Sequence, residues 1–302
     1  MTDIRLSTID LKDTRFKFSY GRDNERLRSS IGIAGIVEPV ILLDRKPYIP
    51  VAGFRRLDCA RSLKMRSVPA LIVDVPEKEA FLRAVHTNIE RGYNIIEKAD
   101  ILSRMDGLGF QRPDILEQME YLGLHPGEKM LKICIAVAGL EPVLKGFIFN
   151  NIASLRNIEL FLLFDAGERK RIVRSLAGVH LTESMVREIF EMLHILRIRK
   201  GKLTGADIPA LPDAGALRAH LKKRTHPVLT SLARKLKAIR DKMAVPPGVD
   251  IRVDPFFEKE YIDLVLRIKD DDGIRTALAT ISGLAEAGHL RSILDLTKGT
   301  IR

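Results

Sequence analysis

The chain has 302 residues, 46% hydrophobic and 29% charged, with a net charge of +11, which is typical of a globular protein of two or three domains. Two cysteines, Cys59 and Cys134, exclude a disulfide framework, and no apolar run reaches the ~18 residues of a transmembrane helix. The N-terminus also lacks the apolar stretch of a secretory signal, so we expect a cytoplasmic protein with no membrane partner.

The first 92 residues predict a domain in which short strands alternate with helices. Residues 24–33 have the spacing of a short helix that ends near Gly35. Such alternation with short connections predicts a mixed α/β fold. Strands are expected at 4–11, 38–43, 48–52 and 68–75.

The stretch 48–56, Tyr-Ile-Pro-Val-Ala-Gly-Phe-Arg-Arg, is the most informative part of this domain. Helical spacing begins directly after Gly53, which predicts a strand, a glycine turn and a helix that opens with Arg55 and Arg56. A helix N-terminus presents unpaired N–H groups, and guanidinium groups beside it favour a phosphate. On this stretch alone, a structural glycine followed by solvated arginines is the alternative.

From residue 77 the pattern becomes helical. Phe81, Val85 and Ile89 recur every four residues, which predicts a helix from residue 77 onward. Asn88 and Arg91 lie three apart, so we expect them to share one helix face. A solvated polar stripe is the alternative to a binding pair.

Residues 93–202 predict an all-α domain. A helix at 114–122, with Asp114 as its cap, and a helix at 127–140 flank a tight break at 123–126. Two helices joined in this way form the helix-turn-helix pattern of many DNA-binding proteins. Further helices are expected at 96–105, 158–164, 168–176 and 182–196.

The second helix of this pair has few side chains suited to reading base edges. Lys129 and Lys132 are its two cations, and its other residues are mainly apolar. We predict DNA contacts from both lysines and from His125 before the helix. Burial of the helix among its neighbours is the alternative.

The last part of the chain, 203–302, predicts a linker, a basic helix and a small strand–helix unit. Gly205, Pro209 and Pro212 mark the linker at 203–214. Paired strands are expected at 250–253 and 261–268, and a helix at 271–287.

Most of the net positive charge lies at 215–243, which has nine basic residues and one acid, Asp241. Basic residues release counterions when they neutralise phosphates, so the segment predicts sequence-independent, salt-sensitive DNA contacts. An apolar seam in the same segment leaves a solvated helix face beside a dimer contact as the alternative. The residues predicted to contact DNA are Lys222, Lys223, Arg224, Arg234 and Lys235, and the seam is Leu232, Leu236, Ile239 and Met243.

Four segments, taken in order, make the chain resemble the ParB/KorB family of partition and plasmid-regulation proteins. Residues 29–40 look like the family's Ser-Ile…Gly-Leu-x-Gln-Pro-Leu segment, and 51–60 like its Ala-Gly-Glu-Arg-Arg…Ala motif. Residues 68–73 follow at the expected distance, and 88–99 look like its Glu-Asn-x-x-Arg…Pro-x-Glu-x-Ala stretch. The resemblance covers roughly the first two-thirds of the chain.

This resemblance implies an α+β protein with three parts. They would be a ParB/sulfiredoxin-like nucleotide-binding domain at 1–92, a helix-turn-helix DNA-binding domain at 93–202 and a C-terminal dimerisation unit within 203–302. In this family nucleotide binding closes a homodimer around double-stranded DNA, so the resemblance implies the same here. A ParA-type ATPase would be a further partner, and the protein would associate with the nucleoid.

The family's two motifs bind CTP, which gives each matching residue an implied role. Gly53 would let backbone approach the phosphates, and Arg55 and Arg56 would neutralise them. Asn88 would contact Mg²⁺ or phosphate, and Arg91 would contact phosphate.

Two departures from the family pattern bear on catalysis. Phe54 and Thr87 stand where the family has glutamates, which would suit a metal ion or an activated water. We therefore expect nucleotide binding and leave a CTPase activity open, while Phe54 either packs on the base or fills core. A transcription or replication regulator with a vestigial pocket and a ParB-domain nuclease are the alternatives. A sulfiredoxin-like reductase is not expected, because Phe54 occupies the place of its reactive cysteine.

Overall fold

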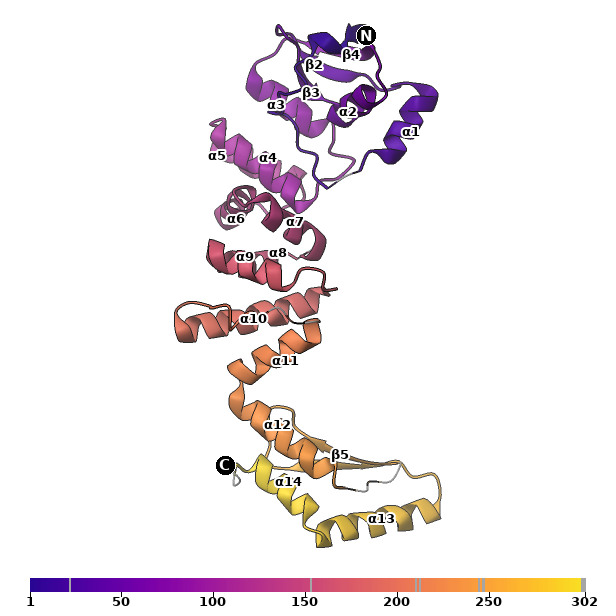
Figure 1. Ribbon diagram of the computed structural model, residues 1–302, viewed down its shortest axis with the longest axis vertical. Helices are drawn as coiled ribbons and strands as arrows, with labels where there is room; N and C mark the ends of the chain where they lie inside the picture. The colour runs from indigo at the N-terminus through magenta and orange to yellow at the C-terminus, as the bar shows by residue number, and fades with distance from the viewer. Residues whose placement is uncertain are drawn as a thin grey trace. The chain divides into compact units, whose positions relative to one another are not determined.

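The computed structural model describes residues 1–21, 23–152, 154–209, 211, 213–243, 245 and 248–299 (Figure 1). The chain forms two compact units, Met1–Ala177 with Leu181–Arg187 and Gly178–His180 with Glu188–Arg302. The three domains expected from the sequence, with boundaries after residues 92 and 202, stay a prediction.

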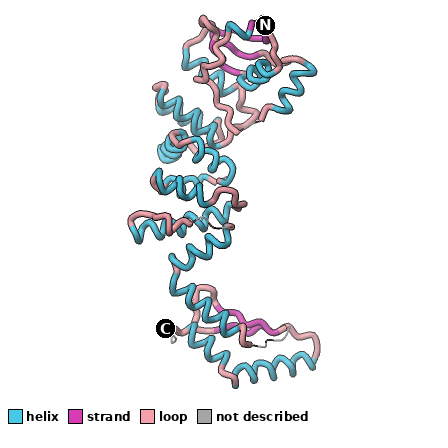
Figure 2. Tube along the Cα trace, in the orientation of Figure 1, coloured by secondary structure: helices cyan, strands magenta, loops and turns pink. Residues whose placement is uncertain are grey.

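A four-stranded mixed sheet lies at the N-terminal end of the first unit (Figures 1 and 2). Its order is β1–β4–β2–β3, in which β4 is antiparallel to β1 and parallel to β2, and β3 is antiparallel to β2. The predicted strand at 4–11 is wrong beyond Arg5, because Thr8 Oγ1 donates to Arg5 O (2.8 Å) and the chain turns into a 3₁₀-helix. The elements are β1 (Thr2–Arg5), the 3₁₀-helix (Leu6–Thr8), β2 (Val40–Leu43), β3 (Ile49–Ala52) and β4 (Ser67–Val73).

Three helices accompany this sheet: α1 (Glu25–Ala34), α2 (Phe54–Ser62) and α3 (Glu77–His86). The helix α1 packs on α2, α2 contacts β2, and α3 contacts β3. Alternate apolar residues of the strands and the inner faces of α1 and α2 form one core. That core contains Ile4, Ile31, Val40, Leu42, Leu57 and Val68. The mixed α/β fold expected for this part is confirmed.

The rest of the first unit is helical, as expected. The helix α5 begins at Arg112, with Pro113 in its first turn and Gln111 as its cap residue, so the predicted cap at Asp114 is wrong. The turn before α6 contains Gly123 with φ of 66°, and α6 packs against α4. The helices are α4 (Ile95–Gly107), α5 (Arg112–Tyr121), α6 (Glu128–Ala138), α7 (Pro142–Asn151), α8 (Leu155–Leu162) and α9 (Ala166–Ser175). Of these, α7 was not predicted as a separate helix.

The second unit contains the predicted antiparallel strand pair and the helix after it. The basic segment forms two helices rather than one, because Pro227 starts a new helix at its first turn. Leu236, Ile239 and Met243 of the predicted seam pack with the strands and the last helices. The elements are α10 (Glu183–Lys200, which begins in the first unit), α11 (Ala214–Thr225), α12 (Pro227–Arg240), β5 (Val249–Val253), β6 (Ile262–Leu266), α13 (Asp271–Glu286) and α14 (His289–Thr297).

The predicted linker at 203–214 is a packed loop over the residues that the structure describes; Pro212 lies outside them. Its carboxylate Asp207 is fully buried and pairs with Lys200 (2.5 Å) and Arg224 (3.5 Å). Burial raises the pKa of Asp207, but hydrogen bonds from Lys200 and Thr204 outweigh it and hold that pKa at about 2. The loop is therefore fixed by an ion-pair cluster.

Candidate functional site

One cleft of the first unit is lined by the residues that the sequence singled out. It lies between the end of β3, the start of α2, the segment at 16–19 and the turn after α3. Its volume of about 190 Å³ is room for several water-sized groups. Nucleotide binding by these residues stays a prediction. The six are Gly53, Phe54, Arg55, Arg56, Asn88 and Arg91.

Gly53 is required by the backbone geometry of the cleft. Its φ is 91°, and a Cβ there would lie 2.8 Å from Val40 Cγ1 and 3.2 Å from Val40 Cα. The predicted strand, glycine turn and helix are confirmed. No described side chain caps α2. The backbone N–H groups of its first residues, Phe54, Arg55 and Arg56, therefore lack a side-chain acceptor where the helix begins at the cleft wall. Phe54 is half-buried there and does not fill the core.

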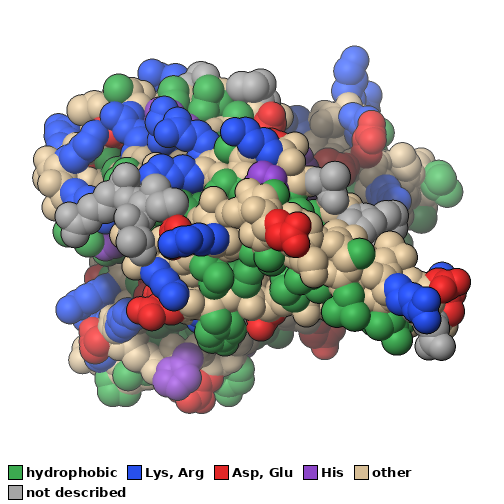
Figure 3. Space-filling model, turned by 90° about the horizontal axis from the view of Figure 1, so that it is seen from below, with side chains coloured by type: hydrophobic (Ala, Val, Ile, Leu, Met, Phe, Trp, Pro, Cys, Tyr) green, Lys and Arg blue, Asp and Glu red, His purple; other side chains and the backbone are tan. Residues whose placement is uncertain are grey.

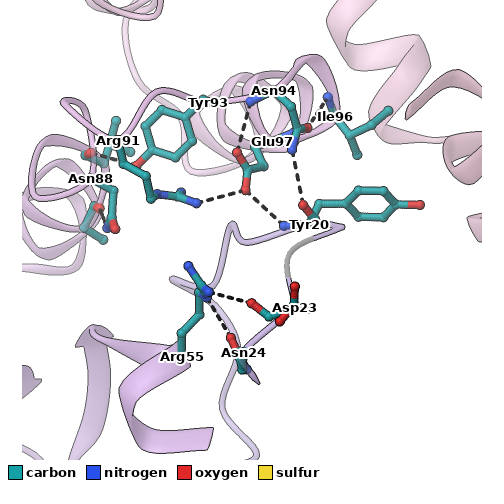
Figure 4. A network of polar contacts seen from close by, with 12 residues as sticks. Tyr20, Asp23, Asn24, Arg55, Asn88, Arg91, Tyr93, Asn94, Ile96 and Glu97 are labelled. Carbon is teal, nitrogen blue, oxygen red and sulfur yellow. Dashed lines mark hydrogen bonds and ion pairs between the residues drawn. The ribbon is translucent and has the colours of Figure 1, made fainter. Parts of the chain in front are cut away.

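Arg55 joins α2 to the start of α1. Its Nε donates to Asn24 Oδ1 (2.7 Å), and its Nη2 donates to Asp23 O (2.6 Å) (Figure 4). Because Asn24 directly precedes α1, these bonds fix how the chain enters that helix. A phosphate bound by Arg55 would use its remaining donors or displace these bonds.

Arg56 is held by the chain just before β2. Its Nη1 donates to Glu38 O (2.6 Å) and Pro39 O (3.1 Å), and it lies 3.2 Å from Glu38 Oε2. Burial lowers the pKa of Arg56, and the Glu38 carboxylate acts in the opposite direction. Arg56 thus has a structural role at β2 as well as a place in the cleft wall.

The turn after α3 differs from the prediction. The helix ends at His86, so Asn88 and Arg91 do not share a helix face. Asn88 Nδ2 donates to Ala84 O (3.1 Å), and the hydroxyl of Thr87 donates to the carbonyl four residues before it (2.6 Å). Such side-chain bonds compete with the helical ladder. They leave Asn88 at the cleft wall, with Oδ1 as an oxygen acceptor.

Arg91 pairs with a fully buried carboxylate, Glu97, on α4 (Figure 4). Its Nη1 lies 3.3 Å from Glu97 Oε1, and its guanidinium lies over the ring of Tyr93. Glu97 also accepts bonds from the backbone N–H of Tyr20 and of Asn94, each 3.0 Å. A buried charge needs such partners, so the cleft and the start of α4 share one polar network.

A second contact joins α4 to the wall segment, which we define as residues 14–20. Arg104 Nη1 donates to the carbonyl oxygens of residues 14 (3.2 Å) and 15 (2.8 Å), and its guanidinium lies over the ring of Phe18. Burial lowers the pKa of Arg104. Because Phe18 lines the cleft, α4 holds the cleft wall through both Arg104 and Glu97.

Several cleft residues were given no role from the sequence. Phe16, Phe18 and Tyr93 supply aromatic surface, and Glu38 supplies a carboxylate. The cluster of aromatic residues Phe16, Phe18 and Tyr20 within five positions is the signal that could have identified the wall segment. The local sequence did not indicate a role for Glu38, because its contact in the cleft is Arg56, which belongs to α2.

In α5 and α6, the two helices predicted to form a helix-turn-helix, the cations lie on the exposed side of α6. Lys132 is exposed, and Lys129 is exposed but paired with Glu159 of α8 (2.9 Å). The ring Nδ1 of His125 lies 3.1 Å from the carbonyl of the next residue. DNA binding by these residues stays a prediction. The other face of α6 is buried through Leu131, Ile133, Cys134 and Val137, as the alternative interpretation expected.

The basic residues of α11 and α12 fall into two groups. Lys222 pairs with Glu188 (3.0 Å), and Arg224 pairs with Asp207 (3.5 Å), so both are engaged within the second unit. Figure 3 shows Lys and Arg side chains gathered on one part of the face that it views and hydrophobic side chains on another. Of the five residues predicted to contact DNA here, Lys223, Arg234 and Lys235 have no ion pair with a described residue, and the first two of them are exposed.

A metal cluster and a membrane-spanning helix are both absent from the part of the chain that the structure describes. No three His, Cys, Asp or Glu side chains gather in a way that could hold a metal ion. Over the same part of the chain, no helix combines the length and the apolarity needed to cross a bilayer.

Comparison with curated proteins finds partition proteins. The probable chromosome-partitioning protein ParB of Vibrio cholerae is 34% identical over 84 residues, 27% of this chain and 29% of that protein. The chromosome-partitioning protein ParB of Myxococcus xanthus is 33% identical over 88 residues, 28% of this chain and 30% of that protein. The probable plasmid-partitioning protein ParB of Thermus thermophilus is 40% identical over 68 residues, 22% of this chain and 23% of that protein. The chain thus matches less than a third of each relative's length.

Two solved structures of C-terminally truncated ParB from Caulobacter crescentus also match. The complex with the centromeric parS site has a TM-score of 0.36 and 14% identity, over 64% of this chain and 98% of the solved one. The complex with CTP-gamma-S has a TM-score of 0.27 and 15% identity, over 58% of this chain and 97% of the solved one. Both scores are too low to support an argument about the overall arrangement.

The family model of the ParB N-terminal domain matches residues 2–89. This range contains the whole four-stranded sheet, the helices α1 to α3 and the cleft residues up to Asn88. Arg91 lies two residues beyond it. Residues 2–89 therefore form a ParB N-terminal domain, and over this part the chain is similar to ParB partition proteins.

Proposed function

We propose that this ParB-like chain is a DNA-binding partition protein whose N-terminal cleft binds CTP with Mg²⁺, and whose homodimer closes around double-stranded DNA when the cleft is filled. The observation that carries the proposal is the cleft itself. A glycine turn, a helix N-terminus without a side-chain cap and the guanidinium groups of Arg55, Arg56 and Arg91 surround one cavity. Backbone N–H groups and guanidinium groups together suit a chain of phosphates better than any neutral ligand.

The roles proposed inside the cleft follow from the donors present. Arg55, Arg56 and Arg91 would hold phosphate oxygens, and Gly53 would let the backbone approach them. Asn88 Oδ1 would be a neutral oxygen ligand for Mg²⁺, which binds such oxygens together with substrate phosphates. Phe54 and Thr87 stand where the family has glutamates. Phe54 offers no proton acceptor, and the hydroxyl of Thr87 is bonded to the backbone, so we propose weak or no hydrolysis.

Cations on both units support the DNA-binding part of the proposal. Lys132 on α6 and Lys223 and Arg234 in the second unit are exposed, which supports contacts with DNA phosphates. Such contacts read no sequence, so we propose that most of the affinity for DNA is salt-sensitive. Association with the nucleoid and a ParA-type ATPase as partner belong to the same proposal.

Exposed apolar side chains of the second unit support the homodimer. They lie on and beside β6 and on α13, where a monomer would leave them in water. A contact with a second copy of the chain would remove these side chains from water. The residues are Leu264, Ile268, Ile274 and Leu278.

Calorimetric titration with the four ribonucleoside triphosphates and Mg²⁺ tests the cleft. We expect heat with CTP for the unaltered chain and at least about tenfold weaker binding for Arg55→Ala, because a charge-assisted contact is lost. Arg61→Ala is the matched control, since Arg61 lies at the other end of α2 with its side chain 66% exposed. No heat with any ribonucleotide would overturn the proposal.

Gel shift with a duplex at low salt, with and without CTP, tests the DNA part. We expect a complex under both conditions and greater retention of closed circular DNA when CTP is present. The absence of any complex at low salt would count against a partition protein.

A regulator with a vestigial pocket is a second candidate, and one observation favours it. Arg55, Arg56 and Arg91 already donate to acceptors of the protein. Melting curves separate the two candidates, because a ligand at 100 times its Kd stabilises the folded state by about 2.7 kcal/mol. A nuclease stays the weakest alternative, and plasmid cleavage with Mg²⁺ that is lost in Arg55→Ala would support it.

A further inference from the structure

We propose that Glu38 makes anion binding in the cleft dependent on a divalent cation. The inference rests on the proposed function, since it concerns the same cleft. Of the described residues that line this cleft, Glu38 alone is acidic. Its carboxylate lies 3.2 Å from Arg56 Nη1, and a negative charge there opposes the anion that this guanidinium attracts.

The contacts of Glu38 separate its backbone from its side chain. Its carbonyl oxygen and that of Pro39 accept from Arg56 at 2.6 and 3.1 Å, which fixes the guanidinium to the start of β2. The carboxylate adds a longer contact of 3.2 Å to the same nitrogen. The Arg56 side chain is 17% exposed, whereas the Glu38 side chain is 84% exposed. The carboxylate can therefore leave Arg56 while Arg56 keeps its place.

Without a divalent cation, Glu38 works against an anion in two ways. Its carboxylate occupies part of the hydrogen-bonding capacity of Arg56, so a phosphate must compete for it. It also places a negative charge beside Arg56, and this charge would repel a phosphate held by the same guanidinium.

A divalent cation reverses the sign of this effect. Mg²⁺ prefers carboxylate and amide oxygens and is commonly held by one or two carboxylates together with the phosphates of a nucleotide. Glu38 and Asn88 are the carboxylate and the amide that line the cleft. Glu38 and Asn88 would be the protein ligands of the cation, and its positive charge would attract both the carboxylate and the phosphate. Glu38 thus supplies the negative oxygen that neither Phe54 nor Thr87 provides.

The test compares CTP titrations in Mg²⁺ and in EDTA for the unaltered chain, Glu38→Gln and Glu90→Gln. The amide of Glu38→Gln keeps the size and an oxygen acceptor but removes the charge. Glu90→Gln is the matched control, because Glu90 is exposed near the cleft and is not among the residues that line it. Affinity is the readout, so hydrolysis is not required.

We expect the unaltered chain and Glu90→Gln to bind CTP at least about tenfold more tightly in Mg²⁺ than in EDTA. For Glu38→Gln we expect tighter binding in EDTA than for the unaltered chain and an advantage from Mg²⁺ of less than about threefold. Mn²⁺ in place of Mg²⁺, followed by its electron paramagnetic resonance signal, should show less bound metal with CTP for Glu38→Gln.

Three results would overturn the inference. Equal dependence on Mg²⁺ in the unaltered chain and Glu38→Gln, with CTP bound by both, removes the role of Glu38 and leaves the proposed function intact. Loss of CTP binding by a folded Glu38→Gln in both buffers gives Glu38 a different role. No binding by any variant in either buffer overturns the proposed function and the inference with it.

Discussion

The arginines of the cleft and the cations of α11 and α12 are similar residues in two different states. Arg55, Arg56 and Arg91 each donate to protein acceptors at fixed positions. Lys223 and Arg234 are exposed and have no ion pair with a described residue. Guanidinium groups held in place define one ligand geometry, whereas unpaired cations on the surface can bind phosphates at any spacing. Net charge therefore indicates a polyanionic partner, and placement indicates which kind of recognition each region performs.

The largest effect should come from the carboxylate that fixes Arg91. Glu97→Ala leaves that guanidinium and two backbone N–H groups without their buried partner. We expect a loss of about 3–5 kcal/mol in the free energy of unfolding of the first unit, because breaking a buried pair strands a charge. Chemical denaturation followed by circular dichroism measures it. The exposed Glu90→Ala serves as control, and a Glu97→Ala midpoint equal to that of the control would show that Glu97 does not fix Arg91.

The free cations should matter most for DNA. We expect the triple variant of Lys223, Arg234 and Lys235 to alanine to bind duplex DNA about 100-fold more weakly at 0.15 M salt and to lower the salt slope by about 2–3. Fluorescence anisotropy over a range of salt concentrations measures both quantities. The paired residues Lys222 and Arg224 provide a control double variant, which should lower the slope by less. Equal slopes for the two variants would erase the distinction between free and engaged cations.

The acid that engages Arg224 should show its effect as a function of pH. The pKa of Asp207 is lowered from 3.8 to about 2, so its contribution of about 2 kcal/mol is complete above pH ~4 and is lost as the pH falls towards 2. Calorimetry of Asp207→Asn and the unaltered chain should give a constant difference between pH 7 and 5 and a shrinking one below pH 4. A difference that disappears already between pH 7 and 5 would contradict this assignment.

The smallest effect separates the two lysines of α6. Lys129 is 79% exposed and bonded to Glu159, and such surface pairs contribute less than about 1 kcal/mol. We expect Lys132→Ala to weaken DNA binding a few-fold and Lys129→Ala to weaken it less, because Lys129 is already partly neutralised. Anisotropy with the same duplex measures both variants. A larger loss for Lys129→Ala would assign the DNA contact to the paired lysine instead.

Features that depend on neighbouring residues in the sequence could be predicted. The strand, glycine turn and helix around Gly53 follow from an apolar run, one glycine and helical spacing, and each is a local signal. The strand pair of the second unit was found for the same reason. The six residues given to the cleft came from the resemblance, and they line one cavity because β3, α2 and the turn after α3 meet there.

Features set by distant partners could not be predicted. The loop at 203–209 looked like a linker because the ion pairs that fix it are not local. Asp207 pairs with Lys200 of α10 and Arg224 of α11, the helices on either side of the loop. The end of α3 was missed because Ile89 continues the helical repeat by chance, while side-chain bonds from Thr87 and Asn88 stop the helix.

The two contacts between α4 and the wall segment have a mechanical consequence. Glu97 and Arg104 lie seven residues apart on α4, about two helical turns, and each grips backbone atoms of that segment. A helix held at two separated points can be rotated as well as shifted by movement of the segment that it holds. A bound molecule that displaces the wall segment outward must therefore tilt α4 or break one of these two contacts.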